Sequence, residues 1–259
     1  MGFRYLNNLV TPENIQQFLE LVDLASGAGK DPGNVFDLSD KLNESHPMSL
    51  CVQAIQQDPN SVEFLKERYV GEPYDIETLL KLPKGSLGWT YATVLNTLGY
   101  NPEFYRTPSE FNSDAEYISY RVYRTHDIHH VITGFSLNNL GELGVLAVTV
   151  AQTRFPAFLF LHILSLLVTF FRSDHLHQED SSPAEQSKTL KYIFQQISTG
   201  LEIGQNAQTL FPVKWEELFD RQIEELREEL NIIPVREGLY SWYSCLLYTS
   251  DAADDLTRV

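Results

Sequence analysis

The sequence of 259 residues predicts an all-α protein, with one multi-helix domain over residues 1–244. Three observations predict this fold class. Cap residues followed by Pro, or by Glu three positions later, mark helix starts along the chain. Between these starts, apolar residues recur with the spacing of one helix face. No stretch shows the alternation of polar and apolar residues that is typical of a half-buried strand.

The first half of the chain contains five predicted helices. Thr11-Pro12-Glu13 combines a cap residue with Pro at the first helical position, so a helix should run from there to about Ser26. Residues 27–33 are rich in Gly and should form a loop. Residues 87–100 are apolar and aromatic on most faces, which indicates a central helix. The other three helices are predicted over residues 45–58, 61–69 and 75–82.

The second half contains five more predicted helices. Ser113 and Glu116 form a capping box, which should open a helix that ends at Gly134. A second helix should start near residues 138–139 and run to about residue 154. The remaining helices are predicted over residues 155–171, from residue 182 to about 200 or beyond, and over residues 212–231. Residues 173–182 are predicted as an exposed polar linker.

Composition limits the class of function. The chain has 19 Lys and Arg against 35 Asp and Glu, a net charge of −16. This acidity argues against nucleic acid as a partner, because phosphate binding needs concentrated basic residues. The two cysteines, Cys51 and Cys245, exclude a disulfide framework and favour a reducing compartment. The first residues lack the apolar region of a signal peptide, so a cytoplasmic location is expected.

The segment from Arg121 to Glu142 contains the candidate metal ligands. His126 and His130 are four residues apart, so they lie one above the other on one face of the predicted helix. Asp127 is about 100° further round and three residues before His130, so its carboxylate can reach the same point. Imidazole nitrogen and carboxylate oxygen are good ligands for zinc. The sequence therefore predicts a site for zinc or a similar divalent metal.

Glu142 is the predicted fourth ligand. On one continuous helix it would lie about 160° from His126, on the far side. Gly134 and the Asn138-Asn139 pair interrupt the helix, so the chain can reverse and bring Glu142 to the metal between two antiparallel helices. A hydrogen-bonded core network without metal is the alternative. His129, about 60° to the other side, is expected to support a ligand or to face solvent.

Residues 155–171 form the most apolar segment. They include no Asp, Glu, Lys or Arg, but at about 1.5 Å per residue they reach about 25 Å, short of a bilayer span. His162 and Ser165 weaken a transmembrane interpretation further. Three alternatives stay open: a buried helix, the lining of an apolar lipid tunnel, or a surface that docks on a membrane.

These residues resemble the Coq-four family of ubiquinone (coenzyme Q) biosynthesis proteins. The signature of that family, H-D-x-x-H, eleven residues and then E, falls on His126, Asp127, His130 and Glu142. Arg124 stands where mitochondrial members carry Glu, which indicates a bacterial branch. The resemblance to this family covers roughly residues 65–232. Its other elements are LPKGSLG at residues 82–88, LGE at 140–142, WE at 215–216 and LREELNI at 226–232.

The resemblance implies an all-α fold, a zinc-like site, a polyprenyl ligand and peripheral association with a membrane surface. It also implies removal of the ring carboxylate from a polyprenyl-hydroxybenzoate, with other quinone-biosynthesis proteins or a second copy of the chain as partners. Arg121, Tyr123 and Arg124 are candidates to hold a substrate carboxylate or prenyl phosphate, or else to form structural ion pairs.

Two functions from different classes therefore remain open. The first is a metal-dependent decarboxylase, in which the metal acts as a Lewis acid. The second is a non-catalytic carrier of prenyl lipid, or a scaffold for other enzymes, with a structural zinc. Four protein ligands are typical of a structural zinc site, whereas catalytic zinc keeps one position open.

The last fifteen residues, CLLYTSDAADDLTRV at 245–259, match neither the periodicity nor the composition of the rest. They resemble a translated sequencing adapter, so we expect them to lie outside the domain. A natural acidic tail is the alternative. Without these residues, which include three Asp and one Arg, the net charge is −14 and Cys51 is the only cysteine.

Overall fold

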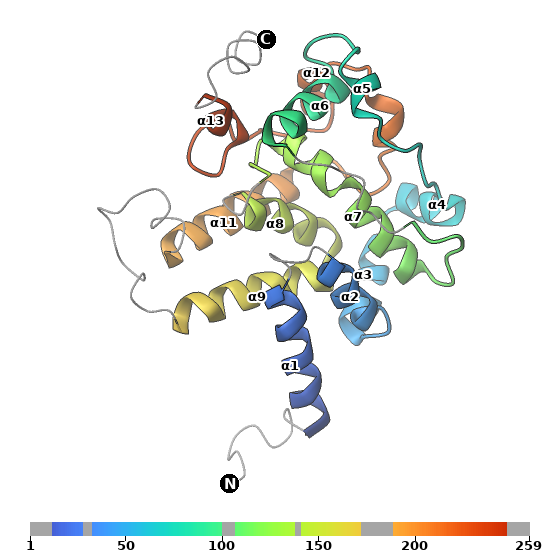
Figure 1. The fold of residues 1–259 in the computed structure, drawn as a ribbon. Coiled ribbons are helices and arrows are strands. Elements are labelled where there is room, and N and C mark those ends of the chain that lie inside the picture. Colours follow the sequence, from blue (N-terminus) through green and yellow to red (C-terminus); the bar gives the residue numbers. More distant parts are fainter. Residues whose placement is uncertain (1–11, 28–32, 100–106, 138–140, 172–188, 248–259) are drawn as a thin grey trace.

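The structure is a computed structural model that describes residues 12–27, 33–99, 107–137, 141–171 and 189–247. All regular elements in these ranges are helices, so the all-α prediction is confirmed (Figure 1). They are, in chain order, α1 (Pro12–Gly27), α2 (Gly33–Leu42), α3 (His46–Ile55), α4 (Pro59–Glu67), α5 (Ile76–Leu79), α6 (Leu87–Leu98), α7 (Asp114–Thr133), α8 (Glu142–Thr153), α9 (Pro156–Phe171), α11 (Leu190–Asn206), the 3₁₀ turn η2 (Trp215–Leu218), α12 (Ile223–Glu229) and α13 (Trp242–Leu247).

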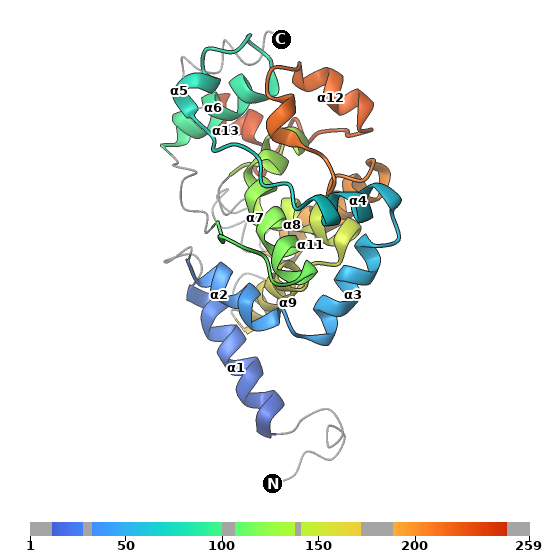
Figure 2. The same ribbon diagram turned by 90° about the vertical axis from the view of Figure 1, so that its right-hand side faces the viewer.

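Helix α7 lies at the centre of the fold, between the other helices in both ribbon views (Figures 1 and 2). In its first half, Tyr117 and Ile118 belong to an apolar cluster with α2, α3, α4 and α9. In its second half, Ile128 and Val131 belong to a cluster with α6, α8 and the C-terminal segment. Its Arg and His side chains are therefore surrounded by protein, and each buried polar group needs a partner.

Helices α8 and α11 pack against each other through glycine. A Cβ atom at Gly200 would lie 2.1 Å from the backbone oxygen of Gly144, and one at Gly204 would lie 2.6 Å from that of Val148. No real Cβ tolerates such distances, so the two backbones touch because α11 has no side chain there. This packing holds α8 in place, and α8 carries Glu142.

The chain reverses between α7 and α8, as predicted. Gly134 ends α7 in the left-handed region, at φ 85°, and donates its N–H to the backbone oxygen of His130. Thr149 of α8 lines the same small cavity as Val122 of α7, whereas Glu142 contacts His130. Helix α8 therefore runs back along α7. Its predicted start at residues 138–139 lies outside the described residues, and the helix begins at Glu142.

The prediction of one continuous helix over residues 212–231 is wrong. The structure has η2 and α12, separated by a turn at residues 219–222. This turn forms because the backbone oxygens of Phe219 and Arg221 accept the N–H groups of Gly88 and Leu87, each at 2.8 Å. These are the unpaired N–H groups at the start of α6, so a tertiary contact replaces helical hydrogen bonds.

Other elements differ from the predictions in their bounds. Helix α2 was not predicted, because Gly33 and Asn34 suggest a loop. Helix α11 is capped by Thr189 and continues to Asn206, in agreement with a predicted end at about residue 200 or beyond. The predicted start at residue 182 and the linker at 173–182 lie outside the described residues. Helix α13 includes the first three residues of the predicted tail, and residues 248–259 lie outside the description.

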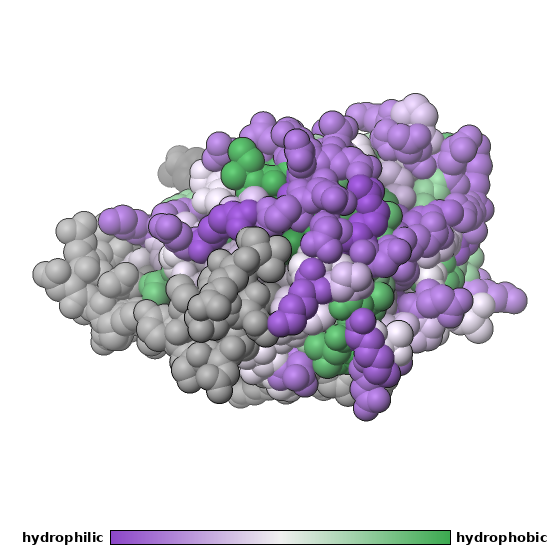
Figure 3. All heavy atoms as spheres, turned by 90° about the horizontal axis from the view of Figure 1, so that it is seen from above, coloured by the Kyte–Doolittle hydropathy of each residue, from purple (hydrophilic) through white to green (hydrophobic). Residues whose placement is uncertain are grey.

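Apolar side chains are exposed on α1 and α9, which lie at the lower end of Figure 1. They include Phe18 and Leu19 of α1, and Leu159, Ile163 and Phe170 of α9. The opposite end, near α5, α6 and α12, is mostly hydrophilic (Figure 3). Among the described helices, none has the length and apolar character needed to cross a membrane.

Candidate metal centre

Three of the four predicted ligands meet between α7 and α8. Nε2 of His126 lies 3.0 Å from Oε1 of Glu142, and Nε2 of His130 lies 3.2 Å from Oε2. The two imidazole Nε2 atoms are 3.2 Å apart. Candidate ligand atoms of all three residues lie within 4.8 Å of one another. The geometry brings two nitrogens and a carboxylate to one point, as a divalent metal site requires.

Neighbouring groups orient this cluster. Nδ1 of His130 donates to the backbone oxygen of Phe135 at 3.3 Å, which leaves Nε2 to face Glu142. The ring of His126 packs edge-on against Phe158 of α9. His162, also on α9, is buried and donates from Nε2 to the backbone oxygen of Leu143 at 2.9 Å. Helix α9 therefore packs against the start of α8, beside Glu142.

The electrostatics of the cluster favour a carboxylate beside protonated imidazole in the metal-free state. Burial alone would raise the pKa of Glu142, but the charges and hydrogen bonds of His126 and His130 hold it well below its usual value. Burial would lower the pKa of His126, but Glu142 and then Asp127 raise it. Negative charge thus dominates around His126, and a metal cation would replace its proton.

Asp127 is buried but is not among the atoms that lie within 4.8 Å of one another. It is three residues after Arg124 and three before His130, so it neighbours both on the surface of α7. Burial raises the pKa of Tyr74 well above its usual value, and the charges of Glu216 and Asp127 add to this effect. Asp127 thus lies between the metal cluster and a second polar network. Its role as a ligand stays a prediction.

His129 does not face solvent, contrary to one of the two predictions made for it. Its side chain is buried, its ring packs edge-on against Trp215, and neither ring nitrogen has a hydrogen-bond partner. Burial, followed by the charges of His126, Arg121 and His130, lowers the pKa of His129 to about 3. It is therefore a neutral side chain of the core, which faces Trp215 and not Glu142.

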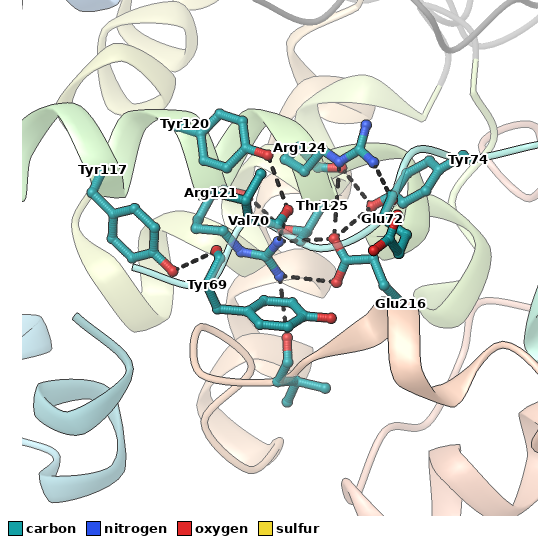
Figure 4. Close-up of polar contacts among 11 residues, drawn as sticks. Tyr69, Val70, Glu72, Tyr74, Tyr117, Tyr120, Arg121, Arg124, Thr125 and Glu216 are labelled. Carbon is teal, nitrogen blue, oxygen red and sulfur yellow. Dashed lines mark hydrogen bonds and ion pairs between the residues drawn. The ribbon is translucent and has the colours of Figure 1, made fainter. Parts of the chain in front are cut away.

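The three predicted substrate residues are engaged inside the protein, and Figure 4 shows two of them, Arg121 and Arg124. Arg121 donates to both carboxylate oxygens of Glu216, at 2.8 and 3.4 Å, and both side chains are almost fully buried. Arg124 donates to the backbone oxygen of Glu72 at 2.7 Å and lies 3.8 Å from the ring centre of Tyr74. The ion-pair alternative is confirmed for Arg121, and a substrate role stays a prediction.

Tyr123, the third candidate, donates its hydroxyl to the backbone oxygen of Val35 at 2.9 Å and packs against Phe155 and Phe158. It also lines a cavity of about 750 Å³ between α2 and the first half of α7. Ser119 and Tyr123 lie on the same face of α7 as His126. Because Asp40, Glu44, Glu110 and Glu116 also line this cavity, it is not the apolar tunnel that was predicted.

Glu216 is the residue that the sequence interpretation missed. Glu216 belongs to the WE pair at residues 215–216, which the sequence analysis names only as an element of the family resemblance. A buried Arg on α7 nevertheless requires an acidic partner elsewhere in the chain. The partner is 95 residues away in sequence, so helical spacing could not identify it.

Fold and site together define an all-α protein with two histidines and one carboxylate held between antiparallel helices. Residues 28–236 match the family described as coenzyme Q (ubiquinone) biosynthesis protein Coq4. This match covers most of the chain, so the chain belongs to the Coq4 family of ubiquinone biosynthesis proteins.

Curated relatives support this membership. The mitochondrial ubiquinone biosynthesis protein COQ4 of Zygosaccharomyces rouxii is 29% identical over 202 residues, which are 75% of this chain and 56% of that protein. The mitochondrial COQ4 homolog of Rattus norvegicus is 27% identical over 194 residues, 73% of this chain and 67% of the rat protein. The chain thus spans little more than half the length of the yeast relative.

A crystal structure supports the fold. A protein of Nostoc punctiforme described as a putative ubiquinone biosynthesis protein superposes with a TM-score of 0.68 at 29% sequence identity. The superposition covers 85% of this chain and 98% of the Nostoc chain.

Proposed function

We propose that this protein holds zinc or a similar divalent metal at His126, His130 and Glu142 and removes the ring carboxylate from a polyprenyl-hydroxybenzoate during ubiquinone synthesis. The convergence of these three side chains within 4.8 Å carries the proposal. Three protein ligands with one position left for substrate is the arrangement of catalytic zinc sites. Asp127 would join them only if its carboxylate turned toward His130.

The donor set fits such an ion. Two imidazole nitrogens and one carboxylate suit zinc in both charge and ligand type. His130 already donates from Nδ1 to Phe135, the second contact that metal-binding histidines commonly make. The carboxylate of Glu142 spans both histidines, so it can bind a cation placed between them.

The chemistry follows from the substrate class. When bound, the metal would supply Lewis-acid stabilisation of the negative charge that develops as the ring loses its carboxylate. The bond from ring carbon to carboxylate breaks, carbon dioxide leaves, and the electron pair stays on the ring carbon, which then takes a proton from water. His126, His130 and Glu142 would hold the metal, which would fix where the reacting end of the substrate lies.

The exposed apolar side chains of α1 and α9 support a lipid partner. Leu159, Ile163 and Phe170 project from a helix that has no charged residue. Phe18 of α1 lies beside Phe160 of α9, which extends the same apolar surface. We propose that this surface contacts the polyprenyl tail or the membrane from which the substrate comes, through apolar area alone, since the net charge opposes anionic lipid.

One observation favours the non-catalytic alternative. Arg121 pairs with Glu216 inside the protein and Arg124 donates to the backbone of Glu72, so both are engaged away from a substrate carboxylate. A prenyl-lipid carrier or scaffold with a structural metal would not need such a residue.

The test combines two measurements on the purified full-length protein. Mass spectrometry identifies the metal and any prenyl lipid it carries. Incubation with polyprenyl-hydroxybenzoate that carries ¹³C in the ring carboxylate then measures release of labelled carbon dioxide. Glu142→Ala is compared with Glu228→Ala, which changes an exposed residue of α12.

Labelled carbon dioxide from the wild type, lost in a folded Glu142→Ala and kept in Glu228→Ala, supports the enzyme. Metal and lipid without turnover support the carrier or scaffold. A protein that carries neither metal nor prenyl lipid contradicts both.

A further inference from the structure

Every backbone oxygen in the last turn of α7 has a partner, and most partners come from the C-terminal segment, residues 223–242. Nε of Arg227 donates to the oxygen of Ile132 at 2.8 Å, and its Nη2 donates to that of Val131 at 2.9 Å. Nε1 of Trp242 also donates to Val131, at 3.1 Å. The N–H of Val235 donates to the backbone oxygen of Thr133 at 2.8 Å. Such oxygens normally lack partners within the helix.

Arg227 contributes charge as well as hydrogen bonds. Its side chain is 2% exposed, although a cation is rarely buried so completely. It lies at the C-terminal end of α7, where the helix dipole favours positive charge. Its Nη1 also donates to Glu224 and to the hydroxyl of Tyr243, both at 2.6 Å, which fixes the guanidinium in place.

The same segment also positions the backbone oxygen of Phe135, which orients the ring of His130. Phe135, whose oxygen accepts from Nδ1 of His130, forms an isolated antiparallel bridge with Ser241. On either side of it, the N–H of Ser136 donates to Tyr240 at 2.8 Å and the N–H of Trp242 donates to Gly134 at 3.0 Å. The acceptor for His130 is thus placed by residues more than 100 positions further along the chain.

From these contacts we infer that Arg227 is a positioning residue for the metal centre: together with the 240–242 pairing, it fixes the last turn of α7 and thereby the direction of His130 Nε2. The inference rests on the proposed metal site. It assigns to the C-terminal segment a role in ligand geometry and not only in stability.

The experiment compares Arg227→Met and Arg227→Lys with the wild type and with Arg221→Met. Arg221 precedes the same helix and forms a surface ion pair with Glu229, so it is a matched control. Zinc dissociation constants are measured by competition with a chelator, at a temperature where circular dichroism shows each variant folded. Cobalt absorption spectra report the geometry of the bound ion.

We expect Arg227→Met to weaken zinc binding by about 10- to 100-fold, the usual effect of losing a group that orients a metal ligand, and to change the cobalt spectrum. The zinc affinity of Arg227→Lys should fall between those of Arg227→Met and the wild type, because Lys keeps the charge and one donor. Arg221→Met should match the wild type. A folded Arg227→Met with wild-type zinc affinity and spectrum would overturn the inference, because a purely structural role changes only stability.

If Arg227→Met does not fold, Arg227→Lys decides alone, because it keeps the charge but cannot donate from two nitrogens to Ile132 and Val131 in the geometry of the guanidinium. If the wild type binds no zinc, the metal proposal fails and the inference is judged separately by ¹⁵N NMR of the histidine rings. His130 should carry its proton on Nδ1 in the wild type, and this preference should weaken in Arg227→Lys and be lost in a folded Arg227→Met. An unchanged tautomer would contradict the inference.

Discussion

His129 and His130 are adjacent residues with opposite environments. His130 donates from Nδ1 and faces Glu142, whereas His129 is buried with no hydrogen bond to either nitrogen. The cause is the turn of about 100° per residue in a helix, which directs one ring to α8 and the other to Trp215. Only His130 has the surroundings expected of a metal ligand.

His129→Leu should therefore keep zinc binding and leave stability unchanged or raise it by about 1 kcal/mol, because it removes buried polar atoms that have no partner. His130→Leu should abolish zinc binding. Thermal unfolding and zinc stoichiometry of both variants check this. A His129→Leu protein that loses its metal would place His129 among the ligands.

Cys51 provides a test of burial at the residue scale. It is fully buried on α3, and burial raises the pKa of its thiol to about 12, from an ordinary value of 9.0. A raised acid pKa in the folded state favours the neutral thiol, so this contribution is complete below pH 9 and is lost as the pH rises toward 12.

In a Cys245→Ser background, Cys51 should not react with a disulfide reagent at pH 8 until the protein is unfolded in guanidinium. Stability should also fall above pH 9, by at most about 1.4 kcal/mol per pH unit from this group. Absorbance of the released thiolate and denaturant titrations measure both. Equal reaction rates in native and unfolded protein would show that Cys51 is accessible.

At the scale of elements, local signals and tertiary contacts compete. The capping box at Ser113 and the Gly134 stop give α7 the bounds that were predicted, because both act within the helix. Residues 219–222 have a helical pattern but bond to the start of α6 instead. The pairing of α8 with α11 depends on the absence of side chains at two glycines, which no apolar stripe reveals.

Gly200→Ala tests that pairing. In an isolated helix the substitution would stabilise by about 1 kcal/mol, since Ala is the better helix former. Here the new Cβ would meet the backbone of Gly144 at 2.1 Å, and overpacking costs about 1–3 kcal/mol. We expect a net loss in thermal unfolding, while Ser198→Ala on the exposed face of α11 should show none. A gain for Gly200→Ala would mean that the helices are further apart.

For the whole molecule, the decisive contacts join distant segments through buried charge. Arg121 and Arg124 of α7 share one carboxylate, Glu216, whose oxygen is 2.8 Å from the first and 3.9 Å from the second. This network holds η2 and residues 70–74 against the central helix, one turn before the metal cluster (Figure 4).

Glu216→Gln keeps the shape but removes the charge, so it leaves the buried guanidinium of Arg121 without its carboxylate partner and weakens the attraction to Arg124. Removing one partner of a buried pair costs about 3–5 kcal/mol, and we expect a loss of that order in urea unfolding. Glu228→Gln, on the surface of α12, should change stability by less than about 0.5 kcal/mol. Similar values for the two variants would show that the network is not buried in solution.

The sequence by itself determined the helical class, the capped ends of α7 and the meeting of His126, His130 and Glu142, three of the four predicted ligands, because each depends on spacing along one helix or on a glycine that breaks it. Only the tertiary structure decided what surrounds them: the pairing of Arg121 with Glu216, the placement of Asp127 between two polar networks, and the capping of α7 by Arg227. These contacts join residues up to 96 positions apart, and burial decides which polar groups meet.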